Sequence, residues 1–261
     1  MHIETIFQKN NQPESKGTVL LLHGVCFGAW YWEDNFLSWF AKKGYDVIAM
    51  SYRNHGNSES KGSIKWRRIS EYLEDIHQVI STISGNIFII GHSMGGFLTQ
   101  HYLQKHQHPQ IKKALLLCTV PAGGVGVASW QIIKTYPLQF IQALCRFSFL
   151  PVFKNQARTK KLMFSNNSAI EKLTPIINRM QDESFLAFLD MLLLNKPSTK
   201  KIKTPLLFIA AAQDFLISPV AIEKNANQLE ADFLLVDGAH NINLEEGWEN
   251  LGQKIAAFFA E

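Results

Sequence analysis

A glycine-rich turn directly after an apolar run constrains the fold of this chain most strongly. The run Ile87-Phe88-Ile89-Ile90 is followed by Gly91-His92-Ser93-Met94-Gly95-Gly96, so a predicted strand bends around a single serine. Small residues are needed around such a bend because its central residue has a strained backbone and the strand and helix approach closely. With a helix predicted over residues 97–107, the pattern is typical of a nucleophile elbow. We therefore expect Ser93 at the carboxyl edge of a sheet.

Strand and helix signals alternate over the first 120 residues and again after residue 200. Apolar runs predict strands at residues 18–22, 45–50, 87–90, 111–118, 205–211 and 233–236. Helical spacing predicts helices at residues 30–43, 69–83, 97–107, 219–229 and 248–259. Repeated crossover units of this kind predict an α/β fold with a doubly wound, mainly parallel sheet.

The alternation is lost between residues 121 and 199, where aromatic and aliphatic helical segments are interrupted by prolines. We predict a core in two parts, residues 1–120 and 200–261, with residues 121–199 inserted as a helical lid. Ligands bind at the carboxyl edge of open parallel sheets, so an insertion there is positioned to form a lid and a substrate pocket. The acidic residues of the insertion are interpreted as solvated helix faces: Asp182, Glu183 and Asp190.

Composition excludes several classes of protein. Hydrophobic residues make up 46% and charged residues 18% of the chain, which indicates a globular rather than a disordered protein. No apolar stretch is long enough for a membrane span, and residues 1–12 lack the pattern of a signal peptide. Three widely spaced cysteines without a C-x-x-C arrangement favour reduced thiols in a cytoplasmic protein and disfavour zinc: Cys26, Cys118 and Cys145.

The net charge of +4 arises from short, dispersed basic groups, which we interpret as solvated faces and not as a nucleic-acid site. These groups are Lys65/Arg67/Arg68, Arg158/Lys160/Lys161 and Lys200/Lys201/Lys203. Neither a phosphate-cradling glycine loop nor a haem or flavin signature is apparent, so we expect no cofactor.

A serine hydroxyl needs a general base to act as a nucleophile, and the base needs a group that orients it. In elbow-containing folds the chain order is serine, acid, histidine. His240 follows the predicted strand at 233–236, and Asp214 follows the strand at 205–211, so both should reach the same sheet edge as Ser93. Asp237 is a competing acid, but Asp237-Gly238 is a turn signal and lies awkwardly close in sequence to His240.

Two backbone amides are predicted to bind the oxyanion that forms during acyl transfer. One is the N–H of Met94, at the start of the helix after Ser93. The other is the N–H of Val25, in the loop after the first parallel strand. Cys26 lies in that loop but has no elbow of its own, so a thiol nucleophile is disfavoured.

Together these residues resemble the α/β-hydrolase superfamily across nearly the whole chain. The resemblance is carried by His23-Gly24, Arg53-Asn54-His55-Gly56-Asn57-Ser58, the elbow, Asp214 and Gly238-Ala239-His240-Asn241. It implies Ser93, Asp214 and His240 as nucleophile, acid and base, and Val25 and Met94 as oxyanion donors. The turn at 53–58 has Asn54 where the family usually has glycine, and its implied role is structural. The elbow sequence is frequent in monoacylglycerol-lipase-like and lysophospholipase-like members.

We expect a serine esterase acting on a small-molecule ester with a hydrophobic acyl or aryl portion, because the insertion is rich in aromatic residues. Two alternatives remain open. The same triad could cleave a carbon–carbon or amide bond, or the chain could be a ligand-binding receptor on this fold. The oligomeric state, acyl-chain length and lid motion are not determined by the sequence.

Overall fold

The structure, a computed structural model, describes residues 1–261 except 107, 199 and 201. The predicted end of the helix at residue 107, the predicted domain boundary at residue 199 and Lys201 of the third basic group therefore lie outside the described residues.

A seven-stranded sheet forms the centre of the molecule, in the order β1-β3-β2-β4-β5-β6-β7. Every neighbouring pair is parallel except β1 and β3, which are antiparallel. The mainly parallel sheet predicted from the sequence is confirmed. The strands are β1 (Thr5–Gln8), β2 (Thr18–Leu22), β3 (Asp46–Met50), β4 (Ile87–His92), β5 (Ile111–Leu117), β6 (Leu206–Ala211) and β7 (Asp232–Val236).

Strand β1 was not predicted from the sequence. It is an edge strand of four residues, three of them exposed, so it lacks the continuous apolar run of a buried parallel strand. It forms because its backbone pairs with β3, for example Thr5 opposite Met50. Pairing with a distant strand leaves no local signal in so short a segment.

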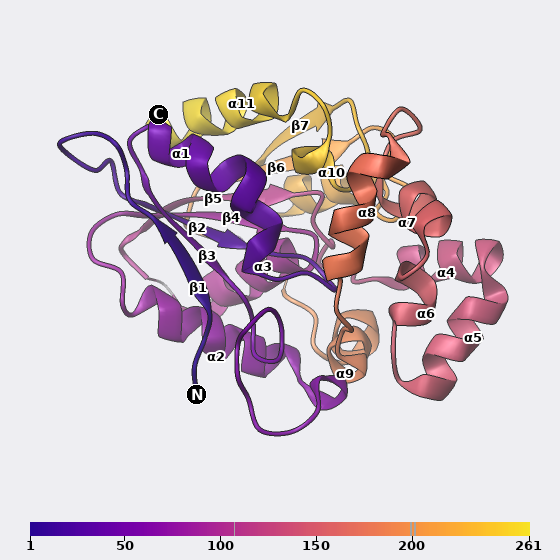
Figure 1. Cartoon of the computed structure of the whole chain (residues 1–261). Coiled ribbons are helices and arrows are strands. Elements are labelled where there is room, and N and C mark those ends of the chain that lie inside the picture. The colour runs from indigo at the N-terminus through magenta and orange to yellow at the C-terminus, as the bar shows by residue number, and fades with distance from the viewer. Residues whose placement is uncertain (107, 199, 201) are drawn as a thin grey trace.

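Helices cover both faces of the sheet (Figure 1). The short α1 (Ser38–Lys42) and the C-terminal α11 (Trp248–Ala260) pack together on one face, and α2 (Ile69–Ile80) and α3 (Met94–Lys105) lie on the other. Helix α10 (Pro219–Gln228) contacts β6 and β7. The predicted helix over residues 30–43 is wrong in its details, because a 3₁₀ turn (Ala29–Trp32) and a π turn (Glu33–Leu37) precede α1.

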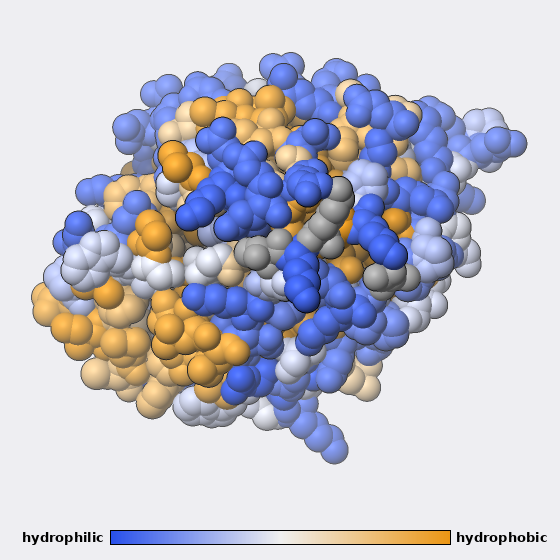
Figure 2. Space-filling view, turned by 180° about the vertical axis from the view of Figure 1, so that it is seen from behind, coloured by the Kyte–Doolittle hydropathy of each residue, from blue (hydrophilic) through white to orange (hydrophobic). Residues whose placement is uncertain are grey.

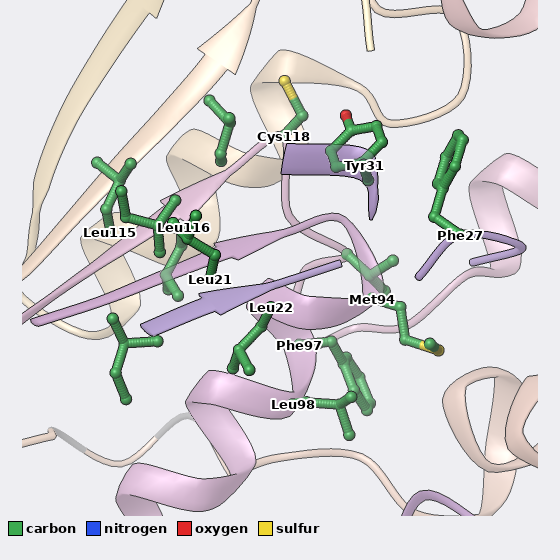
Figure 3. Packing of buried hydrophobic residues seen from close by; sticks show 14 of the residues in the cluster. Leu21, Leu22, Phe27, Tyr31, Met94, Phe97, Leu98, Leu115, Leu116 and Cys118 are labelled. Atoms are coloured by element: carbon green, nitrogen blue, oxygen red, sulfur yellow. The ribbon is translucent and has the colours of Figure 1, made fainter. Parts of the chain in front are cut away.

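Buried side chains of the central strands and α3 form the core around the elbow. Figure 3 shows Leu21 and Leu22 from β2, Leu115 and Leu116 from β5, and Met94, Phe97 and Leu98 from α3. All seven are fully buried. Burying a leucine or phenylalanine side chain contributes about 1.5–3 kcal/mol, so this core holds the end of β4 and the start of α3 firmly in place.

Between β5 and β6 the chain forms a succession of short helices, which lie together at one end of the sheet (Figure 1). We refer to Gly126–Leu194 as the β5–β6 segment. It contains α4 (Gly126–Thr135), α5 (Pro137–Arg146), α6 (Leu150–Phe153), α7 (Gln156–Met163), α8 (Ile170–Arg179), α9 (Phe185–Leu189) and a final π-helical turn, Asp190–Leu194. Among the described residues, no helix is both long and apolar enough to cross a bilayer.

Candidate functional site

Ser93 lies at the sharp turn between β4 and α3. Its φ of 53° and ψ of −115° place it outside the ordinary regions for a residue with a side chain. The turn is possible because its neighbours are glycines: a Cβ at Gly91 would lie 2.5 Å from the Gly95 carbonyl oxygen, and one at Gly95 would collide with the backbone of Leu22. The local structure therefore has the form of the predicted elbow, with Ser93 at its apex.

His240 and Asp214 lie beside Ser93, as the chain order predicted. Nε2 of His240 is 3.0 Å from Oγ of Ser93, and Nδ1 is 2.8 Å from a carboxylate oxygen of Asp214. The second carboxylate oxygen accepts the backbone N–H groups of Leu216 and Ile217, each at 2.9 Å. All three side chains are buried. With its proton on Nδ1, the imidazole donates to Asp214 and leaves Nε2 free to accept from the serine hydroxyl.

The competing acid Asp237 is not part of this arrangement. Its carboxylate accepts a hydrogen bond from the side chain of Gln213 on the exposed surface. Asp214 is fixed by two backbone amides in addition to the imidazole, which holds its carboxylate in one orientation.

His92 supports His240 from the elbow. Its Nε2–H donates to the backbone carbonyl of His240 at 2.9 Å, and the two rings lie 4.9 Å apart. Burial and the nearby His240 lower the pKa of His92 well below its usual value, so its ring stays neutral. A neutral ring at this position adds no charge beside the proposed base.

The two predicted oxyanion donors lie at the same edge of the sheet. Met94 is the first residue of α3, and Val25 lines the same cavity as Ser93 and His240. In the part of the chain that the structure describes, neither backbone N–H donates to a protein acceptor. Both amides are therefore free to bind an oxygen of a ligand.

Glu183 anchors the loop that carries Val25, and the prediction that this side chain lies on a solvated helix face is wrong. Its side chain is buried, and one oxygen accepts the N–H of Cys26 at 3.2 Å and contacts Nε2 of His55 at 3.1 Å. The other oxygen accepts from Tyr72 Oη at 3.0 Å and from the N–H of Ser184 at 2.7 Å. Burial alone would raise the pKa of Glu183, but His55 and these amides lower it overall, so the carboxylate is ionised.

The other two acidic residues of the segment also accept hydrogen bonds from the protein, Asp190 from the core and Asp182 from within the segment. Asp190 is fully buried, pairs with the guanidinium of Arg68 at 2.6 Å and accepts the N–H of Ile69 at the start of α2. Asp182 accepts the N–H of Phe149. The sequence could not reveal these roles, because the partners of Asp190 lie more than a hundred residues away and appear only when the segment folds onto the sheet.

The turn at residues 53–58 contributes a further support. Asn54 has a φ of 63°, which explains why glycine is usual there and why asparagine, which tolerates this conformation, can replace it. The guanidinium of Arg53 donates to both oxygens of the buried Asp75 on α2. His55 reaches Glu183 from this turn, so the turn, α2 and the Val25 loop meet at one carboxylate.

An apolar cavity of about 70 Å³ extends from Ser93 into the β5–β6 segment. Ser93, His240 and Val25 line one side of it. The segment contributes almost entirely apolar side chains to the other side, among them Ala128, Ile132, Phe140, Phe149, Val152, Phe153, Phe188 and Met191. Glu183 is the one carboxylate in this lining among the described residues, and its oxygens are already hydrogen bonded.

Cys26, in the loop that carries Val25, is not activated as an alternative nucleophile. Burial, together with Glu183 and Asp182, raises the pKa of Cys26 well above its usual value, so its thiol stays protonated. All three cysteines are free. In the described part of the chain, no cluster of three or more His, Cys, Asp or Glu side chains could hold a metal ion.

Comparison with curated proteins gives partial matches. The bifunctional esterase/perhydrolase of Acinetobacter calcoaceticus is 28% identical over 120 residues, which cover 44% of this chain and 41% of that protein. The non-heme chloroperoxidase of Burkholderia pyrrocinia is 30% identical over 119 residues, covering 44% of this chain and 42% of that protein. The aligned regions thus span about two fifths of the length of these curated relatives.

Comparison with solved structures covers the chain as a whole. The monoacylglycerol lipase of Paleococcus ferrophilus has a TM-score of 0.74 at 17% identity, covering 99% of this chain and 98% of that one. A putative non-heme bromoperoxidase of Mycobacterium tuberculosis has a TM-score of 0.80 at 18% identity, covering 100% and 96%. At such low sequence identity the similarity shows only that this chain has the same fold as these two proteins. Residues 13–240 match the family described as serine aminopeptidase (S33), and the chain therefore belongs to that family within the α/β-hydrolase superfamily.

Proposed function

We propose that this chain is a serine hydrolase that cleaves a carboxylic ester with a hydrophobic acyl or aryl portion. The observation that carries the proposal is that Ser93, His240 and Asp214 are buried, are linked by hydrogen bonds in that order, and lie at the end of an apolar cavity. A hydroxyl within hydrogen-bonding distance of an oriented imidazole is the arrangement that nucleophilic catalysis requires.

In the first half of the reaction, Nε2 of His240 takes the proton of Ser93 while Oγ attacks the ester carbonyl carbon. The carbonyl oxygen becomes an oxyanion, which the free N–H groups of Val25 and Met94 stabilise. Asp214 stabilises the imidazolium through the Nδ1–H bond. The imidazolium then gives its proton to the leaving alcohol or phenol, and the acyl group remains on Ser93.

In the second half, water takes the place of the leaving group. His240 removes a proton from the water, and the resulting nucleophile attacks the acyl-serine carbonyl within the same two amides. Collapse of this second oxyanion breaks the bond to Ser93 Oγ, which recovers its proton from His240. The carboxylic acid leaves and the resting site is restored.

The cavity supports an apolar acyl or aryl group and disfavours a peptide with a free amino terminus. A terminal ammonium group needs a carboxylate with free acceptor capacity. Glu183 is the carboxylate in the described lining, and both of its oxygens are already hydrogen bonded. Its partners are the backbone amides of Cys26 and Ser184 and the side chains of Tyr72 and His55. The family is described as serine aminopeptidase, but this cavity offers no such carboxylate among the described residues. We therefore rank cleavage of an amide bond, or of a carbon–carbon bond, by the same residues as the second function.

We further propose that residues 121–199 act as the lid of this site. Supporting this, the β5–β6 segment supplies most of the apolar side chains around the cavity.

We also propose that the chain works in a reducing compartment such as the cytoplasm. Its three cysteines form no disulfide, which supports this location.

The test is hydrolysis of p-nitrophenyl esters from acetate to palmitate by the native chain and by Ser93→Ala. We expect multiple turnovers with a preference for longer chains over acetate, and loss of turnover in the variant by about 10³-fold or more. Persistent activity in a folded Ser93→Ala protein would refute the role of Ser93. Inert esters together with turnover of an aryl amide or a vinylogous diketone would favour the second-ranked function.

A further inference from the structure

The outer surface of the β5–β6 segment is unusually apolar. Helices α4 and α5 turn Ala128, Ile132 and Phe140 toward the cavity, yet their opposite sides are apolar too. Eight of the 13 exposed large apolar side chains among the described residues belong to this segment, and we refer to them as the outer apolar face. They are Val127, Trp130, Leu138, Ile141, Leu144, Phe147, Leu193 and Leu194.

The elements that carry these residues adjoin one another, since α4 contacts α5. Figure 2 shows a broad apolar region at the lower left, on the side of the molecule that carries α4 and α5. The final turn of the segment, which holds Leu193 and Leu194, adjoins the start of α4, because the N–H of Val125 donates to the carbonyl of Met191. Helix α5 buries only Ala143, so most of its apolar surface faces solvent. Exposed apolar areas of this kind mark interaction sites more often than chance.

The stretch of chain that carries six of the eight residues of the outer apolar face, residues 126–163, has charges of one sign only. No aspartate or glutamate occurs between residues 76 and 170. Over residues 126–163 the basic residues are Lys134, Arg146, Lys154, Arg158, Lys160 and Lys161. Nζ of Lys134 lies 5.1 Å from the centre of the Trp130 ring, so a cation lies directly beside the tryptophan of the outer apolar face. Lys134, Arg146, Lys154 and Lys161 are exposed.

We propose that the outer apolar face docks on an anionic phospholipid bilayer. Apolar side chains with a cationic surround are the combination that binds the interface of such a bilayer, because the side chains enter the acyl boundary and the cations hold anionic headgroups. The charge pattern selects this occupant over a neutral lipid surface. Docking itself does not depend on the proposed hydrolase activity, although it would place the cavity lined by Ile132 and Phe140 next to apolar substrates.

The test is co-sedimentation of the full chain with vesicles of phosphatidylcholine alone and of an equimolar mixture of phosphatidylcholine and phosphatidylglycerol. We expect binding to the anionic vesicles to be at least about tenfold stronger, and to weaken at high salt. The triple variant Trp130→Ser/Leu138→Ser/Ile141→Ser should lose most of this binding. The variant Lys134→Glu/Arg146→Glu should lose the preference for anionic vesicles.

A matched control removes exposed apolar side chains elsewhere. Val220→Ser/Leu235→Ser changes two exposed residues of α10 and β7 and should bind vesicles like the native chain. Circular dichroism and thermal unfolding establish that each variant is folded. Equal binding by the native chain and the triple variant, or no sedimentation of the native chain, would overturn the proposal. A native dimer in light scattering that the triple variant converts to a monomer would overturn it as well, since a second copy would then cover the face.

Discussion

The two sides of the cavity differ in how their residues are fixed. On the sheet side, Ser93 has a strained backbone and the neighbouring glycines are in close contact with other backbone atoms. Hydrogen bonds link Ser93 to His240 and His240 to Asp214. The segment side consists of short helices whose apolar side chains line the cavity and whose opposite sides are exposed. Changes on the sheet side should therefore abolish the reaction, whereas changes on the segment side should alter which substrates are accepted.

After the loss of Ser93 itself, the largest expected effect is that of Asp214→Asn. An amide cannot stabilise the imidazolium and favours the wrong tautomer of His240, so kcat should fall by about 10³–10⁴-fold with the fold intact. Steady-state kinetics on a p-nitrophenyl ester measures this. The matched control is Asp237→Asn, whose carboxylate binds Gln213 on the surface, and it should retain native kcat. Equal losses in both variants would contradict the assignment of Asp214.

Gly95→Ala should be the most destabilising substitution at the elbow. The new Cβ would collide with the backbone carbonyl groups of Leu22 and His23, which cannot move without displacing β2. We expect a loss of about 3 kcal/mol or more in the free energy of unfolding, measured by urea denaturation. Gly123→Ala is the control, because nothing lies within 4 Å of its added Cβ. A stable, fully active Gly95→Ala protein would show that the turn is less tightly packed than we infer.

Glu183→Gln tests whether the β5–β6 segment also takes part in the chemistry. Replacing one acceptor by an amide weakens the bond to the N–H of Cys26 and loosens the loop that carries Val25. Because an oxyanion forms only in the transition state, kcat should fall about tenfold while KM changes little. A purely structural role would instead lower the thermal unfolding temperature without this split between kcat and KM. Glu171→Gln, on the exposed side of α8, is the control.

Ile132→Ala should change selectivity more than rate. The side chain of Ile132 lines the cavity, so its truncation enlarges the space and should shift the optimum of the p-nitrophenyl ester series toward longer acyl chains by about tenfold in relative kcat/KM. Ile141→Ala removes a comparable side chain from the exposed side of the neighbouring helix. An identical shift in both variants would mean that the cavity does not hold the acyl chain.

The smallest expected effect concerns stability at mildly acidic pH. Burial lowers the pKa of His92 in the folded protein, so as the pH falls below about 6.5 the unfolded chain binds a proton that the folded chain does not. The free energy of unfolding should therefore decrease as the pH falls through this range. Urea denaturation of the native chain and His92→Gln should show a shallower decrease in the variant, whereas the exposed His2→Gln should match the native slope.

The sequence alone determined the features that depend on local backbone geometry and chain order. Gly91, Gly95 and the apolar run before them predict a tight strand-to-helix turn, because such a bend needs small residues at these positions. Once the strands are parallel, every loop that follows a strand lies at one edge, which brings Asp214 and His240 to Ser93 from distant positions. The fold class and the positions of these three side chains could therefore be predicted without any knowledge of packing.

Only the tertiary structure decided what depends on contacts between distant segments. Strand β1 exists because β3 offers an edge, and Glu183 and Asp190 are buried because the β5–β6 segment brings them to Cys26, His55 and Arg68. A charged side chain in an amphipathic helical sequence predicts a solvated face, since its local pattern does not show a partner more than a hundred residues away. Burial of such a carboxylate is tolerated when backbone amides and a cationic or hydrogen-bonding side chain surround it, and those donors are assembled only by the folded chain.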